Sequence, residues 1–108
     1  MKSDYILRLI EQAAAAMAQV AGLKKSGQAA QAQERLDAAF TQLTGMSRKL
    51  AERLDAPSLR AMMHSKPGGD ERTQVMARLL LAQADLIGGT AEAENLRRKA
   101  RQLESLQS

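Results

Sequence analysis

The feature that most constrains the fold is a long amphipathic segment near the N-terminus, residues 4–23, with the sequence DYILRLIEQAAAAMAQVAGL. At 100° per residue, its apolar side chains cover more than the single stripe of an ordinary surface helix. The residues left for the opposite side are Arg8, Glu11, Gln12, Ala15, Ala18 and Gln19. So broad an apolar surface predicts a helix that several neighbours contact, and we expect it to be the central helix.

Composition favours one domain made of helices. The chain has 108 residues, which is typical of a single domain. It contains twenty alanines, the best helix-forming residue, but one Phe, one Tyr and no Trp. The β-branched residues that strands prefer are few. The sequence therefore predicts an all-α single domain over residues 1–108.

Breaks in the apolar periodicity divide this domain into an array of about six helices. Ser47, Asp70 and Thr90 are placed to cap three of them. We expect residues 65–69, which contain Pro67-Gly68-Gly69, to form a flexible loop. The predicted helices cover residues about 4–24, 28–44, 47–54, 57–64, 70–87 and 90–106.

Two of the predicted helical hairpins share one spacing pattern. Gly27 precedes Ala32 and Ala39 at the same offsets at which Gly88 precedes Ala93 and Ala100. This pattern resembles the second half of a tetratricopeptide repeat, in which small residues allow two helices to pack closely. The two copies are much further apart than the roughly 34 residues of a tandem array. We therefore predict tetratricopeptide-like hairpins joined by short connecting helices.

A family resemblance accompanies this pattern. The segment DYILRLIEQ, residues 4–12, resembles the opening helix of a small uncharacterised bacterial family, a domain of unknown function whose members end in tetratricopeptide-like hairpins. The segment TAEAENL, residues 90–96, resembles the late hairpin of that family, whereas residues 13–16 and 66–70 depart from its pattern. The resemblance implies the helical fold and implies no activity.

No cluster of residues in the sequence amounts to an active site. Cysteine is absent, which excludes disulfides, thiolate zinc sites and cysteine nucleophiles. His64 is the only histidine and is typical of a helix C-terminus, where the helix dipole favours a cation. The carboxylates are scattered, and residues 66–70 lack the pattern of a phosphate-binding loop. We predict a protein that is not an enzyme and has no cofactor or metal site.

The densest basic cluster includes Arg97, Arg98 and Arg101, which share one helix face. Across the whole chain, 16 basic and 12 acidic residues are interspersed, as on a solvated surface. Glu94 and Glu104 are spaced to pair with these arginines. Three interpretations remain open: a solvated face, a site for an acidic partner, and a nucleic-acid site. The lack of aromatic residues among them disfavours base stacking.

Tyr5, Leu23 and Leu81 lie at the edges of the predicted apolar stripes or outside them. Exposed together, they would form a patch that monomers tend to avoid. We therefore predict that part of helix 4–24 or of helix 70–87 packs against a second copy in a two-fold homodimer.

The N-terminal segment is predicted to be neither a signal peptide nor a membrane span. Asp4, Arg8 and Glu11 interrupt it, and residues 13–18 are shorter than the roughly 7–15 residues of a signal-peptide core. We expect no segment to approach the ~20 apolar residues of a membrane span. The sequence therefore predicts a cytoplasmic protein without a membrane partner.

These observations predict a non-enzymatic protein-interaction or scaffold module that holds a helix or peptide of a partner protein in a helical groove. The alternative is a nucleic-acid-associated regulator that uses the basic face of the C-terminal helix.

Overall fold

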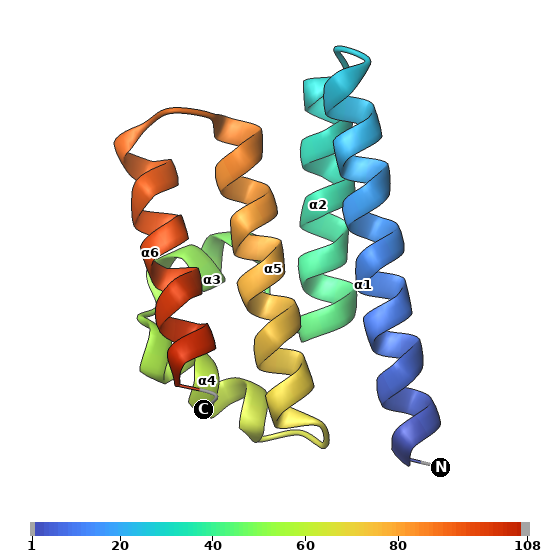
Figure 1. The fold of residues 1–108 in the computed structure, drawn as a ribbon, viewed down its shortest axis with the longest axis vertical. Coiled ribbons are helices and arrows are strands. Elements are labelled where there is room, and N and C mark those ends of the chain that lie inside the picture. The colour runs from blue at the N-terminus through green and yellow to red at the C-terminus, as the bar shows by residue number, and fades with distance from the viewer. Residues whose placement is uncertain (1, 107–108) are drawn as a thin grey trace.

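The computed structural model describes residues 2–106, with side chains from Asp4 onwards, and this part of the chain contains six α-helices and no strand. The all-α prediction is thus confirmed, and the predicted boundaries differ only at the helix ends. The helices are α1 (Lys2–Lys25), α2 (Ala29–Thr44), α3 (Arg48–Arg53), α4 (Ala56–His64), α5 (Gly69–Ile87) and α6 (Ala91–Ser105). α1 and α2 form one antiparallel hairpin, and α5 and α6 form another (Figure 1).

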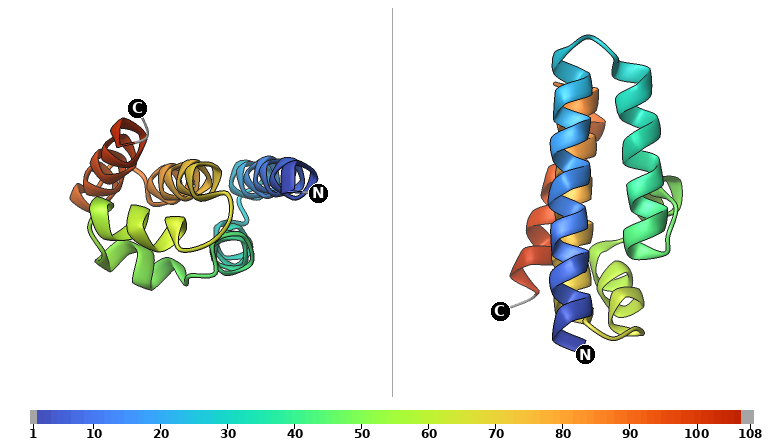
Figure 2. Two further views of the ribbon diagram at one scale, coloured as in Figure 1. Left: turned by 90° about the horizontal axis from the view of Figure 1, so that it is seen from below. Right: turned by 90° about the vertical axis from the view of Figure 1, so that its right-hand side faces the viewer.

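The helices are arranged in two layers. α6, α5 and α1 lie side by side in one layer, and α2, α3 and α4 form the other (Figure 2). α5 packs against α1, α2, α4 and α6, whereas α1 contacts chiefly α2 and α5. The central helix is therefore α5, and the expectation that the N-terminal helix would be central is wrong.

The apolar surface of α1 is broad, but only one stripe of it is buried. Leu9, Ala13, Ala16 and Val20 form this stripe. The rest of the apolar surface includes four exposed alanines and three larger exposed side chains, those of Tyr5, Leu7 and Ile10. Alanine favours a helix without needing a packing partner. The apolar periodicity of a sequence gives alanine the same weight as leucine. It therefore overestimates how much of the surface of α1 other helices bury.

Small residues allow both hairpins to close. Ala32 and Ala39 of α2 and Ala93 and Ala100 of α6 are all fully buried, as their spacing after Gly27 and Gly88 predicts. Larger core side chains fill the space between the two layers. Those that are almost completely buried include Leu36, Phe40, Leu59, Met63, Met76, Leu79, Leu80 and Leu103.

Two of the three predicted helix caps are confirmed. The Ser47 hydroxyl accepts a hydrogen bond from the backbone N–H of Leu50, and the Thr90 hydroxyl accepts one from that of Ala93. The prediction for Asp70 is wrong, because α5 begins at Gly69 and its N-cap position is occupied by Gly68.

Gly68 closes the connection between α4 and α5 in a conformation that suits glycine. Its φ is +77°, in the left-handed region. A Cβ at this position would contact the Ile6 side chain of α1, so α1 and the connection approach each other closely. The flexibility of residues 65–69 stays a prediction, which limited proteolysis can test.

Candidate helix-binding groove

A groove of about 640 Å³ lies between the C-terminal halves of α1 and α5. The two helices run side by side in the same direction here (Figure 1). The apolar lining consists of Met17, Val20, Ala21, Leu81, Ala82 and Leu86. The charged lining consists of Lys24, Lys25, Arg78 and Asp85.

The groove results from side chains of unequal size on the two helices. Val20 is buried and holds α1 against the core. Met17, Leu81 and Leu86 are only partly buried, although they pack against the core cluster. Between them, Ala21 of α1 is exposed and fills little space. The result is a concave apolar surface that faces solvent, which is the usual form of a binding site.

Positive charge dominates the edge of this groove. Lys24 donates a hydrogen bond from Nζ to the backbone oxygen of Asp85 at 2.6 Å, which links the ends of α1 and α5. Lys25 and Arg78 form no ion pair with the part of the chain that the structure describes. The Asp85 carboxylate lies 3.7 Å from Arg97 of α6 and is thus already partly neutralised.

The boundary between α1 and α5 continues beyond the groove towards the N-terminus of α1. A second hollow of about 30 Å³ lies there, and Met17 and Arg78 line both hollows. It also includes Ile10, whose side chain is 40% exposed. The exposed apolar surface therefore extends beyond the groove along α1.

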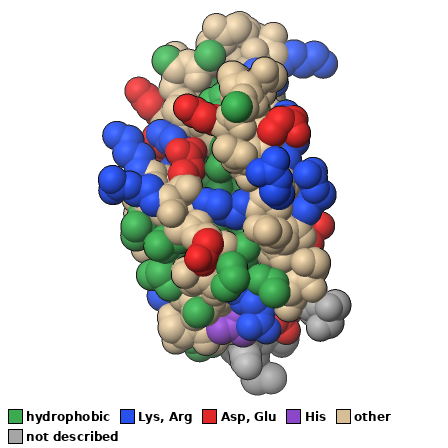
Figure 3. Space-filling model, turned by 90° about the vertical axis from the view of Figure 1, so that its left-hand side faces the viewer, with side chains coloured by type: hydrophobic (Ala, Val, Ile, Leu, Met, Phe, Trp, Pro, Cys, Tyr) green, Lys and Arg blue, Asp and Glu red, His purple; other side chains and the backbone are tan. Residues whose placement is uncertain are grey.

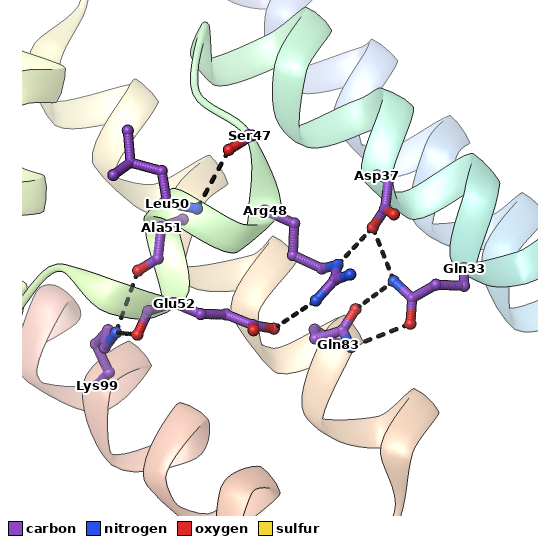
Figure 4. A network of polar contacts seen from close by, with 9 residues as sticks. All are labelled: Gln33, Asp37, Ser47, Arg48, Leu50, Ala51, Glu52, Gln83 and Lys99. Atoms are coloured by element: carbon purple, nitrogen blue, oxygen red, sulfur yellow. Dashed lines mark hydrogen bonds and ion pairs between the residues drawn. The ribbon is translucent and has the colours of Figure 1, made fainter.

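A polar network behind the groove has a structural role (Figure 4). Asp37 of α2 accepts hydrogen bonds from Gln33 at 2.8 Å and from Arg48 of α3 at 2.5 Å. Arg48 also donates to Glu52 at 3.0 Å, and Gln33 pairs with Gln83 of α5. Burial lowers the pKa of Arg48, but its hydrogen bonds to Asp37 and Glu52 and their charges outweigh this effect and raise the pKa. These polar groups satisfy one another and join three helices.

Lys99 of α6 binds the C-terminal end of α3. Its Nζ donates to the backbone oxygens of Ala51 at 3.1 Å and Glu52 at 2.7 Å (Figure 4). Burial lowers the pKa of Lys99, whereas the charges of Glu52 and Asp55 raise it, and the net shift is downward. The ammonium group of Lys99 thus satisfies two backbone oxygens in the last turn of α3, where the helix dipole favours a cation, and it is not free to bind a partner.

The predicted basic face of α6 carries both signs of charge. Arg97 pairs with Glu94 at 2.7 Å, as its spacing predicts, and also with Asp85. Arg98 instead donates to Asn95 at 3.0 Å, and Arg101 is exposed. Figure 3 shows Lys and Arg side chains across the middle of this side of the molecule, with Asp and Glu side chains among them.

The structure does not bring Tyr5, Leu23 and Leu81 together in one patch. Tyr5 and Leu23 are at opposite ends of α1, about 27 Å apart at the rise of an α-helix. Leu23 is half-buried against the core, and Leu81 lines the groove. Tyr5 is 47% exposed, and its hydroxyl accepts a hydrogen bond from Arg72. The homodimer stays a prediction, which sedimentation at high micromolar concentration tests.

His64 lies at the C-terminal end of α4, as predicted. Its Nδ1 is 2.9 Å from the backbone oxygen of Arg60, and its Nε2 is 2.9 Å from Oδ1 of Asp70. Sequence reasoning missed the contact with Asp70. Among the described residues, no group of three or more His, Cys, Asp or Glu side chains is placed to hold a metal ion.

Residues Asp4–Lys25 of α1 are long and apolar enough to cross a membrane by length and composition alone. This corrects the expectation that no segment approaches a membrane span. The reason is that residues 12–23 contain no charge. Helices inside globular proteins and N-terminal signal sequences share these properties, so the cytoplasmic location stays a prediction.

No protein-family model, curated protein or solved structure matches this chain.

Proposed function

We propose that this protein is a non-enzymatic interaction module that binds a helix of a partner protein in the groove between α1 and α5. The observation that supports this most is an open groove of about 640 Å³ with a largely apolar lining, which lies between two long parallel helices. A helix in such a groove would bury its own apolar stripe against Met17, Leu81 and Leu86.

The helical framework supports the same proposal. The α1–α2 and α5–α6 hairpins pack through fully buried alanines, and polar contacts join α2, α3, α5 and α6. A groove between such helices is formed before a partner arrives, which reduces the entropy cost of binding. The tetratricopeptide-like spacing and the resemblance to an uncharacterised bacterial family belong to this proposal, because helical repeats commonly bind peptides.

The nucleic-acid alternative has weaker support. Arg97 is paired with two carboxylates, Arg98 is bonded to Asn95, and only Arg101 of the three points to solvent without a described contact. Binding to duplex DNA that weakens with salt and is lost when Arg97, Arg98 and Arg101 become Ala would favour this alternative.

An affinity pull-down with three matched baits tests the proposal. Leu81→Arg places a charge in the groove, and Leu50→Arg makes the same change on α3, where Leu50 is 41% exposed. We expect the wild type and Leu50→Arg to recover the same nuclease-resistant partner, and Leu81→Arg to lose it. Equal recovery by all three baits would show that the groove is not the binding site.

A further inference from the structure

The charges around the groove indicate which helix fits it. Lys24 and Lys25 lie at the C-terminal end of α1, and Arg78 lies on the facing side of α5. Lys24 bonds only a backbone oxygen, while Lys25 and Arg78 form no described ion pair. The Asp85 carboxylate faces Arg97. The groove therefore presents three cations whose charge no described carboxylate pairs.

The direction of α1 and α5 adds a second constraint. Both helices run from the lower to the upper end of the molecule in Figure 1, so their C-terminal ends lie together beside the groove. Each C-terminal end carries a partial negative charge from the helix dipole. Lys24 and Lys25 already offset part of this charge, and Lys24 bonds a backbone oxygen in the last turn of α5. The dipoles therefore favour a bound helix that runs antiparallel to α1 and α5 only weakly, through their opposed directions.

The two constraints agree on one arrangement. The N-terminal turn of a helix favours acidic residues, which oppose its own dipole. In an antiparallel helix, this turn lies beside Lys24 and Lys25. We propose, on the basis of the proposed function, that the partner is an amphipathic helix with acidic residues in its first turn, bound antiparallel to α1. The acidic turn contacts Lys24 and Lys25, and the apolar stripe covers Met17, Leu81 and Leu86.

The groove also sets the length of the contact. From Met17 to Lys24 on α1, and from Arg78 to Leu86 on α5, the lining covers about two helical turns. A stripe with apolar residues at positions i, i+3, i+4 and i+7 matches this length. The acidic residues stand one turn before this stripe in the partner sequence.

Two synthetic helical peptides test the proposal. Both carry the i, i+3, i+4, i+7 apolar stripe, and they differ in having Glu or Gln in the first turn. We expect the Glu peptide to bind the whole protein about fivefold more tightly at low salt, as two exposed ion pairs allow. The difference shrinks as salt screens the charges.

Variants of the protein locate the effect. Lys24→Glu/Lys25→Glu removes both cations that the acidic turn contacts. The ratio of the two affinities is therefore expected to lose its preference for the Glu peptide, and this ratio is the readout because the substitution also changes the lining of the groove. Lys49→Glu/Arg53→Glu makes the same change in charge at exposed positions on α3 and is expected to leave the preference intact. A preference that survives Lys24→Glu/Lys25→Glu would overturn the proposal.

A nitroxide at the N-terminal end of the Glu peptide reports its direction. We expect it to broaden the backbone amide signals of residues 22–25, and broadening of residues 10–13 instead would overturn the antiparallel arrangement. A dimer in sedimentation that Leu81→Arg converts to a monomer would also overturn it, because a second copy would then occupy the groove. A last outcome separates the two proposals. If neither peptide binds, but the Leu81→Arg bait still loses the partner in the pull-down, the proposal of an acidic amphipathic helix is wrong and the proposed function stands.

Discussion

Gln33 and Gln83 exchange two hydrogen bonds between their side-chain amides. The Nε2 of Gln33 is 2.7 Å from Oε1 of Gln83, and the Nε2 of Gln83 is 3.1 Å from Oε1 of Gln33. Gln83 is 2% exposed, so its amide has almost no access to water. The pair joins α2 to the central helix α5, and Asp37 accepts a further bond from Gln33.

This pair predicts an asymmetric response to mutation. Gln83→Leu leaves the Gln33 amide half-buried with one partner fewer, and we expect it to lower the free energy of unfolding by about 1–3 kcal/mol. Adding Gln33→Leu removes the remaining unpaired amide and is expected to recover part of the loss. Urea denaturation of the wild type, the two single variants and the double variant measures both effects. A double variant that is no more stable than Gln83→Leu alone would contradict this interpretation.

The helices and hairpins could be predicted from the sequence because their determinants are local. Apolar periodicity gave the six helices, and the spacing of Ala32, Ala39, Ala93 and Ala100 identified the closely packed positions. The position of α1 could not be predicted in the same way. Its Ala13–Ala16 run is equally compatible with a central and an outer helix, because an exposed alanine costs little.

The groove and the polar network depend on contacts between distant segments. Gln33 and Gln83 belong to different hairpins, and nothing near either residue in the sequence indicates that they meet. The groove is a space between Ala21 and Leu81 on two helices that are not consecutive. Periodicity identifies which residues face inward, but not which helices lie next to each other.

The contact between Tyr5 and Arg72 predicts that the first turns of α1 depend on a buried cation. Arg72 is 7% exposed and donates to Tyr5 and to the backbone oxygens of Leu43 and Pro67. Tyr5→Phe keeps the ring, whose centroid is 5.4 Å from the guanidinium carbon, but removes the acceptor. We expect the free energy of unfolding to fall by about 1 kcal/mol. This is less than the roughly 1.5–3 kcal/mol of a hydrogen bond to a charged group, because water reaches this site.

Leu7→Ala is the matched control for this prediction. Leu7 is on the same part of α1 and is 57% exposed. Its truncation is expected to change the free energy of unfolding by less than about 0.5 kcal/mol. Chemical denaturation compares the two variants, and an equal effect of both would mean that the Tyr5 hydroxyl does not stabilise the fold.

Substitution of three glycines by alanine is expected to change the stability of the fold in three different ways. Gly27 and Gly68 both have φ near +80°, but a Cβ at Gly27 meets open space, whereas one at Gly68 contacts Ile6. We expect Gly27→Ala to cost about 1–2 kcal/mol from backbone strain and Gly68→Ala to cost more. Gly22 is helical and open, so Gly22→Ala is expected to stabilise by about 0.5–1 kcal/mol.

Thermal unfolding measures the glycine series. Ile6→Ala combined with Gly68→Ala removes the side chain that the new Cβ would contact, so the two changes together should cost less than their sum. Strict additivity would show that α1 and the α4–α5 connection do not approach as closely as described.

Asp55 predicts an acid-dependent loss of stability at the start of α4. Its side chain accepts hydrogen bonds from Ser58, including one from the backbone N–H at 2.9 Å, and these bonds lower the pKa of the carboxyl group. The folded state therefore holds this proton less tightly than the unfolded chain does. The resulting stabilisation is complete above the unfolded pKa of about 3.9 and is lost as the pH falls through the lower, folded pKa.

Asp55→Asn retains a capping side chain without a titrating group and is expected to reduce the dependence of unfolding on pH in this window. Ser58→Ala removes only the hydroxyl donor and is expected to give an intermediate dependence, measured by urea denaturation at a series of acid pH values. A slope identical in all three proteins would rule out a role for Asp55 in acid stability.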